Sequence, residues 1–148
     1  MTDVMPVGRE MEMIAHDFAV AMRGAMDERQ IDAAVESILA PATSYPATGS
    51  IVSAIFYLQF QVKVKDGGKT FNGKAGGIST PGGGALLGAV QTNDINRLYA
   101  DTASFFFSAT AASVALIFFD RHHNSLGGGT FGAVSIVSGT GGGPGSWS

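Results

Sequence analysis

The first part of the chain carries apolar side chains at the spacing of a helix. One stripe recurs every three or four residues, at Met11, Ile14, Phe18 and Met22. A second stripe with the same spacing runs from Ile31 to Leu39. The pattern predicts helices over about residues 9–25 and 28–40, with Asp27 as the N-cap of the second. Pro41 and Pro46 end the helical pattern, so we expect the chain to divide near Pro41–Gly49.

After Gly49 the period changes to two. Apolar side chains alternate without a break at Val52, Ala54, Phe56, Leu58, Phe60, Val62 and Val64. Their neighbours become polar along the segment, which is typical of a strand with one dry and one wet face. Asp66, Gly67 and Gly68 then predict a hairpin turn, because they tolerate positive φ.

The remaining chain repeats short apolar runs separated by glycine-rich turns. We expect turns at Pro81–Gly84, Asn93–Asp94 and Arg121–Ser125, and Ile95–Tyr99 suits either a strand or a short helical turn. The segment from Ser113 to Asp120 is apolar on both sides. Eighteen of the 21 glycines follow Asp66, which favours strong coiling of the strands. Further strands are predicted over residues 69–79, 85–92, 103–109, 113–120, 126–138 and 139–148.

These elements predict a mainly β protein, a closed eight-stranded antiparallel β-barrel preceded by one or two short α-helices. We assign residues 1–45 to an acidic helical N-terminal segment and residues 46–148 to the barrel domain. A small barrel of this kind fills its interior with side chains, so we expect no roomy ligand cavity. The predicted core residues are Val52, Phe56, Leu58, Phe60, Phe105, Phe107, Ile117 and Phe119.

The apolar stripe of the first helix must also be buried, since so short a helix is marginal alone. We expect residues 1–40 to pack only weakly on the barrel or to lie across one of its ends. The stripe would then plug that end, join a second copy or meet a membrane.

Charge is unevenly divided along the chain. Residues 1–40 hold eight acidic and three basic side chains, whereas the rest holds four acidic and six basic ones. Neither part has the clustered basic face of a nucleic-acid-binding protein. No apolar run reaches the roughly 18 residues of a membrane-spanning helix, and the N-terminus lacks the basic start and apolar core of a signal peptide. Without cysteine, the chain has no disulfide or thiolate chemistry.

Four lysines form the charge cluster of most interest. Lys63 and Lys65 lie on the wet face of a predicted strand, and Lys69 and Lys74 follow across the hairpin turn. Such a group can contact an anionic lipid surface, each basic side chain contributing about 1 kcal/mol. A solvated hairpin, in which lysines block edge pairing, is the alternative.

Other chemical groups are better explained as structure. His122 and His123 follow Asp120 in a turn, where adjacent histidines rarely point at one metal ion. Asp94 and Asp101 flank Arg97, so we expect Asp94 to cap or turn the chain and Arg97 to pair with an aspartate. The glycine runs at 82–84 and 127–129 lack the Lys-Ser or Lys-Thr of a phosphate-binding loop. We therefore expect no catalytic residues, no metal and no cofactor, and a protein that is not an enzyme.

Several motifs in one order resemble the virulence-associated protein (Vap) family of actinobacterial intracellular pathogens. The likeness covers about residues 50–148, roughly two-thirds of the chain. It rests on Gly76–Leu86 (GGISTPGGGAL), Thr92–Tyr99 (TNDINRLY) followed by Asp101-Thr102, Phe118–Asp120 (FFD), Gly132–Ser135 (GAVS) and Gly141–Trp147 (GGGPGSW).

The resemblance implies an eight-stranded antiparallel barrel with Greek-key connections and a short helix at one end. It also implies secretion to the bacterial surface or host vacuole, a role in survival inside phagocytes, and no established catalytic residues or cofactor. One class of members is linked to acidic lipids and to disturbed vacuole acidification. The acidic helical front of this chain departs from the family, whose members carry an export signal and a variable leader.

Two functional hypotheses follow. The first is a non-enzymatic secreted effector that contacts anionic lipid or a host component. The second is a small-ligand or carbohydrate-binding barrel, which would need a deep polar pocket.

Overall fold

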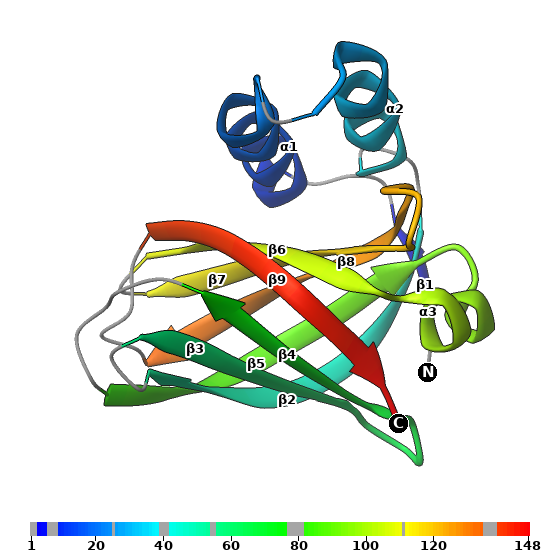
Figure 1. The fold of residues 1–148 in the computed structure, drawn as a ribbon. Helices are drawn as coiled ribbons and strands as arrows, with labels where there is room; N and C mark the ends of the chain where they lie inside the picture. Colours follow the sequence, from blue (N-terminus) through cyan, green and yellow to red (C-terminus); the bar gives the residue numbers. More distant parts are fainter. Residues whose placement is uncertain are drawn as a thin grey trace.

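The computed structural model describes residues 3–5, 9–24, 26–38, 42–53, 56–76, 82–110, 112–134 and 139–148. Two helices precede a curved sheet, and a third, short helix interrupts it (Figure 1). The elements in chain order are β1 (Asp3–Met5), α1 (Arg9–Met22), α2 (Glu28–Ile38), β2 (Ala42–Ser53), β3 (Tyr57–Val64), β4 (Thr70–Gly76), β5 (Gly82–Thr92), α3 (Ile95–Asp101), β6 (Ser104–Ala109), β7 (Ser113–Phe119), β8 (Ser125–Val134) and β9 (Gly139–Trp147).

Eight antiparallel strands close into a barrel, as the sequence predicts. The strand order is β2-β3-β4-β9-β6-β7-β8-β5, and β5 pairs back onto β2. β1 adds to the start of β2, where Asp3 lies opposite Ser44. In each run of four strands, β2–β5 and β6–β9, the fourth lies beside the first, which is the Greek-key arrangement. We call each run of four strands a key. The two keys are joined by the pairs β4–β9 and β8–β5, each of which joins the third strand of one key to the fourth strand of the other. The barrel therefore has internal two-fold topology.

Glycines lie where the backbones of the two keys approach each other most closely. A Cβ atom at Gly88 would overlap the backbone of Thr130 across the β5–β8 seam. A Cβ atom at Gly143 would overlap the Lys74 carbonyl oxygen across the β9–β4 seam. The glycine-rich composition of the second half therefore allows the closure of the barrel.

Aromatic side chains fill the barrel interior. Phe71 lies at their centre, with ring centroids 5.3 Å from Phe105, 4.9 Å from Phe118 and 5.5 Å from Trp147. The predicted core residues Leu58, Phe60, Phe105 and Phe107 are confirmed as interior. The inside of the described strands is therefore occupied by packed rings.

The core assignment of Val52 and Phe56 is wrong. Both side chains are exposed, Phe56 at 71%. The alternation that runs from Val52 to Val64 spans two strands: β2 ends at Ser53 and β3 begins at Tyr57. The turn between them changes which residues face inward, because Ile51 and Ser53 are buried in β2 whereas Leu58 and Phe60 are buried in β3.

The segment Pro41–Gly49, where the sequence predicts that the chain divides, lies largely within a strand. β2 occupies residues 42–53 and pairs with β5 from Thr43 to Ser53. Pro46 lies between the stretch of β2 that pairs with β1 and the stretch that pairs with β3 from Ala47 onwards. A proline is tolerated in this strand because its neighbour on that side changes there.

A second apolar cluster lies outside the barrel, under the helices. β7 is apolar on both sides, as predicted, but Ile117 and Phe119 face outward with Phe106 and not into the interior. Phe18 of α1 packs on this wall, 5.6 Å from Phe106 and 5.3 Å from Phe119 between ring centroids. The helix pair therefore covers the wall formed by β6, β7 and β8 (Figure 1), and the expected position across one end of the barrel is wrong. Met11 and Ile14 have side chains outside the described residues.

Helix starts and turns follow the sequence closely. The Asp27 carboxylate accepts a hydrogen bond from the backbone N–H of Arg29 (3.3 Å), which confirms it as the N-cap of α2. Asp66 and Gly67 both have positive φ in the β3–β4 turn, as the hairpin prediction requires. Residues 95–101 form α3, the helical alternative, and this helix packs by Leu98 against the core at the barrel end. Residues 82–84, expected in a turn, already belong to β5.

Candidate interaction surface

Three lysines project from the outer face of the β3–β4 hairpin. Lys63 occupies an exposed position of β3, whose pattern alternates strictly between exposed and buried, and Lys65 is exposed directly after the strand ends. On β3, Lys63 lies opposite Thr70. On β4, Lys74 lies opposite Gln59. We call Lys63, Lys65 and Lys74 the lysine face. The pairing of the two strands thus brings together residues that are up to 11 positions apart in the sequence.

The fourth predicted lysine, Lys69, lies apart from this face. Its ammonium group is 5.9 Å from the ring centroid of Tyr99 in α3, and its backbone N–H donates to the Tyr99 hydroxyl (3.3 Å). Lys69 is therefore turned toward the end of the barrel that carries α3.

Two aromatic residues adjoin the lysine face. The Lys74 ammonium lies 4.5 Å from the ring centroid of Tyr57, the first residue of β3. Phe56 precedes it and is the most exposed of the large hydrophobic side chains described. Sequence reasoning missed both as surface residues, because Phe56 continued the apparent alternation of a single strand.

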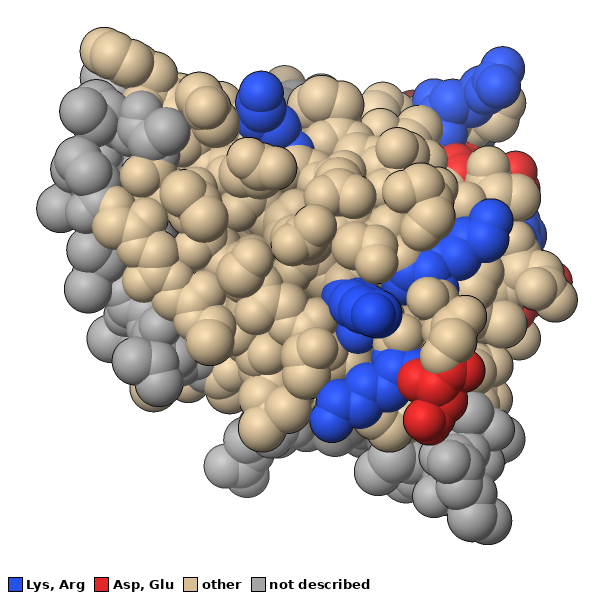
Figure 2. All heavy atoms as spheres, turned by 90° about the horizontal axis from the view of Figure 1, so that it is seen from below, with Lys and Arg blue, Asp and Glu red and all other residues tan. Residues whose placement is uncertain are grey.

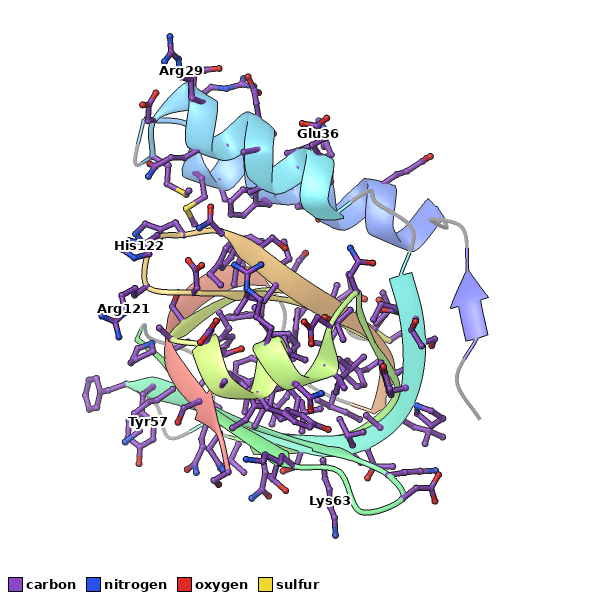
Figure 3. All side chains as sticks on the ribbon, turned by 90° about the vertical axis from the view of Figure 1, so that its right-hand side faces the viewer. Arg29, Glu36, Tyr57, Lys63, Arg121 and His122 are labelled. Atoms are coloured by element: carbon purple, nitrogen blue, oxygen red, sulfur yellow. The ribbon has the colours of Figure 1, made fainter. Side chains whose placement is uncertain are left out.

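The lysine face and the acidic helices lie on opposite walls of the barrel. β3 and β4, which carry the lysine face, are four strands away from β7 and β8 in the closed order of eight. Figure 3 shows Lys63 pointing away from the barrel on the side opposite α2, whose Glu36 points outward. Seen from below, basic side chains cross the middle of the face, with acidic ones at the right (Figure 2). The structure therefore separates basic and acidic surfaces.

Asp94, Arg97, Asp101 and Asp120 form a structural network. The Asp94 carboxylate accepts from the Arg97 backbone N–H (3.1 Å) and caps α3. The Arg97 guanidinium lies 3.6 Å from a carboxylate oxygen of Asp101 and 3.6 Å from one of Asp120. Both sequence expectations, the cap and the arginine–aspartate pair, are confirmed.

Asp120 organises the β7–β8 turn that carries the two histidines. Its carboxylate accepts from the backbone N–H of His122 (2.8 Å) and from the backbone and side-chain N–H groups of Asn124 (2.9 and 3.1 Å). Burial alone would raise the pKa of Asp120, but these bonds from Asn124 and His122 and the attraction to His122 outweigh it and lower the pKa. His123 has positive φ and closes the same turn.

This lowered pKa predicts a pH-dependent contribution to stability. A depressed pKa in the folded state stabilises the fold above the unfolded value, near 3.9, and that stabilisation is lost as pH falls through the folded pKa. Asp120→Asn should lower the free energy of unfolding at pH 7 by about 1–2 kcal/mol, and urea titration at pH 3 should show a smaller loss. Asp101→Asn, at the exposed ion pair, should cost less than about 1 kcal/mol. An equal loss for Asp120→Asn at both pH values would be inconsistent with this role.

Among the described residues, no group of three or more His, Cys, Asp or Glu side chains is arranged to hold a metal ion. The described helices are each too short or too polar to cross a bilayer. The run Gly127–Gly129 lies within β8, and Gly82–Gly84 begins β5, so both are followed by strand and not by the helix of a phosphate-binding loop.

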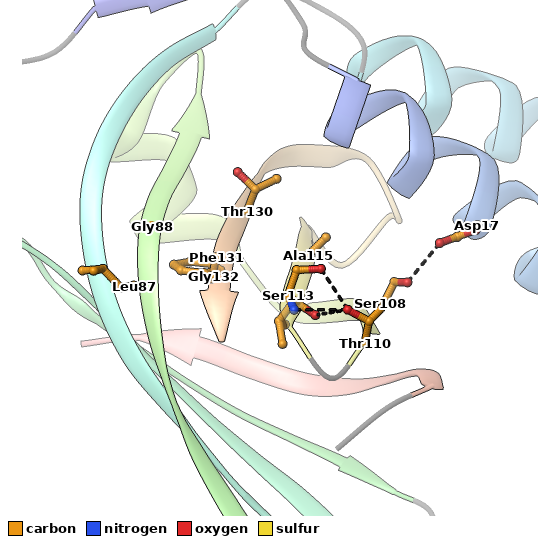
Figure 4. A pocket seen from close by; sticks show the side chains of 11 residues that line it. Asp17, Leu87, Gly88, Ser108, Thr110, Ser113, Ala115, Thr130, Phe131 and Gly132 are labelled. Carbon is orange, nitrogen blue, oxygen red and sulfur yellow. Dashed lines mark hydrogen bonds between the residues drawn. The ribbon is translucent and has the colours of Figure 1, made fainter. Parts of the chain in front are cut away.

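A pocket of about 370 Å³ opens on the outer wall between β5, β8 and the β6–β7 hairpin (Figure 4). The Ser108 hydroxyl, on one side, donates to the Asp17 carboxylate of α1 (3.0 Å). The Thr110 and Ser113 hydroxyls lie 3.0 Å apart and bond to each other. Leu87 and Phe131 line the opposite side. The hydroxyl groups of Ser108, Thr110 and Ser113 thus already have partners within the protein.

Comparisons with known proteins agree with the fold. The family model described as Rhodococcus equi virulence-associated protein matches residues 7–148. The solved structure of VapB from the intracellular pathogen Rhodococcus equi is 41% identical, with a TM-score of 0.68 over 72% of this chain and 97% of that one. VapD from the same organism is also 41% identical, with a TM-score of 0.69 over 72% and 98%. A comparison with curated proteins gave no match.

Proposed function

This chain belongs to the Rhodococcus equi virulence-associated protein family, and from that premise we propose that it is a secreted, non-enzymatic effector that contacts an anionic lipid surface. One observation carries the lipid contact: the lysine face lies on the barrel wall opposite the acidic helices. Export to the cell surface or a host compartment follows from the family resemblance.

The charge arrangement gives the protein a defined orientation at an anionic membrane. Each lysine near a charged bilayer contributes about 1 kcal/mol, so three on one face are enough for reversible binding. The acidic helices would be repelled from the same surface, and the barrel holds them on its far side. Both effects favour contact through β3 and β4.

Vesicle sedimentation tests this proposal. The chain should bind vesicles that contain phosphatidylserine and should not bind pure phosphatidylcholine vesicles. Binding should fall steeply between about 50 and 500 mM salt, since such attraction is screened over about 8–10 Å at physiological salt. Equal binding to neutral vesicles, or binding that salt does not weaken, would refute contact through the lysine face.

A small-ligand or carbohydrate binder is the second candidate. The aromatic core fills the barrel interior, so this function would fall to the outer pocket beside Asp17. Its Ser108 hydroxyl bonds to Asp17 and its Thr110 and Ser113 hydroxyls to each other, and a ligand would have to displace those bonds. We therefore place membrane contact first.

A further inference from the structure

Charge is segregated along the barrel axis as well as around it. Residues 42–148 contain ten charged side chains, and eight of them lie in the three connections at the end that carries α3. The other two, Lys63 and Lys74, lie on the strands of the lysine face. The four connections at the opposite end contain no charged residue: positions 54–56, 77–81, 110–112 and 135–138.

The strand order explains why these four connections lie at the same end of the barrel. Because the strands are antiparallel and consecutive in each key, β2–β3, β4–β5, β6–β7 and β8–β9 all connect at one end. The described part of that end is uncharged on the left of Figure 2, while charged side chains lie in the middle and on the right. The sequence of the connections supplies Ile55, Ile78, Ile136 and Val137 but no charged group.

Exposed apolar side chains mark the described part of this end. Val52, at the end of β2, and Phe56, before β3, are both more than half exposed, and Tyr57 follows on the outer face of β3. We call these three residues the apolar rim. Figure 3 shows Tyr57 pointing outward, and the Lys74 ammonium lies over its ring. The rim is thus joined to the lysine face through Lys74.

We propose that the apolar rim enters the headgroup region of the anionic bilayer to which the lysine face is attracted, so that Phe56 is a membrane anchor. The inference rests on the proposed lipid contact and adds the site and depth of insertion. Aromatic residues favour the membrane interface, and lysine stems extend beside them with the ammonium group at the headgroups. The described part of this end carries no charged side chain, which removes the main cost of inserting it.

Tryptophan substitution tests the depth of insertion. Phe56→Trp should show a blue-shifted emission on phosphatidylserine vesicles and quenching by brominated lipid. Leu87→Trp is the matched control, because Leu87 is 63% exposed but lies in the middle of β5, opposite Thr48. It should show neither change. The native Trp147, buried in the core, gives the same background in both variants.

Serine substitution tests the contribution to affinity. Phe56→Ser should weaken binding to these vesicles at least about tenfold, because a buried phenyl side chain contributes about 1.5–3 kcal/mol. Leu87→Ser should leave binding within about twofold. Both variants should keep the native melting temperature, since neither side chain packs in the interior.

The outcomes separate this inference from the proposed function. Salt-sensitive binding without quenching at position 56 would retain the lysine contact and reject insertion. Quenching with salt-insensitive binding would retain insertion and reject the lysine face as the attracting surface. Absence of vesicle binding would reject both. Self-association that Phe56→Ser abolishes, without lipid quenching, would assign the rim to a second copy and overturn the inference.

Discussion

Replacing Phe18 by alanine should release the helix pair from the barrel wall. Phe18 is 1% exposed and stacks on Phe119 while meeting Phe106 edge to face. A buried Phe→Ala change typically costs 3–5 kcal/mol. Helices of 14 and 11 residues are marginal without tertiary contacts, so we expect local unfolding before the barrel is affected. Hydrogen exchange should show faster exchange over residues 9–38 and unchanged protection in β3 and β4.

A control on the same helix isolates the packing contribution. Val20 is 56% exposed, and Val20→Ala should change the free energy of unfolding by no more than about 0.5 kcal/mol. Phe18→Ala should also uncover Phe106, Ile117 and Phe119, with increased binding of a hydrophobic dye. Unchanged protection of the helices in Phe18→Ala would show that the pair is held by other contacts.

The interior should be at least as sensitive at Phe71. This side chain has no exposed surface and is in ring contact with Phe105, Phe118 and Trp147. Phe71→Ala should lower the free energy of unfolding by about 3–5 kcal/mol, a large part of the 5–15 kcal/mol typical of a domain. Urea denaturation gives the loss directly, and the emission of Trp147, the only tryptophan in the chain, reports the change in packing beside it.

Phe56→Ala is the matched control, the same substitution at an exposed position. It should leave the free energy of unfolding within about 0.5 kcal/mol of the native value. If the two variants were equally destabilised, the assignment of Phe71 to the core and Phe56 to the surface would be wrong.

Local signals in the sequence predicted much of the fold. The barrel follows from period-two segments and their turns, and Asp27 and Asp66 behave as their residue types require. The error at Val52 and Phe56 has a physical cause. Val52 continues an alternation whose parity changes between β2 and β3, whereas Phe56 lies in the connection before β3 begins, and nothing in the pattern marks either feature.

The position of the helices depends on contacts that are distant in sequence. β7 is apolar on both faces, so its outer side requires a covering element, but the pattern does not identify that element. Phe106 carried the same signal in β6. The apolar stripes of α1 and α2, which include Phe18 and Ile31, need a partner surface. Combined with the apolar outer faces of β6 and β7, these stripes would have predicted that the helices pack on that wall and not across the barrel end.

The candidate surface was predicted in part. Alternation placed Lys63 and Lys65 on the wet face, and the hairpin placed Lys74 near them. Lys69 departs because its position in the turn directs it toward Tyr99, a contact across 30 residues. The separation of the lysine face from the acidic helices required the closed strand order, which no local pattern contains.

The most direct test of the lipid contact compares two variants with the same change in net charge. Lys63→Gln/Lys65→Gln/Lys74→Gln removes the lysine face, and Arg23→Gln/Arg29→Gln/Arg121→Gln removes three exposed positive charges elsewhere. Affinity for phosphatidylserine vesicles should fall about 100-fold in the first variant, at about 1 kcal/mol per lysine, and only slightly in the second. An equal fall in both variants would show that net charge, and not the lysine face, determines binding.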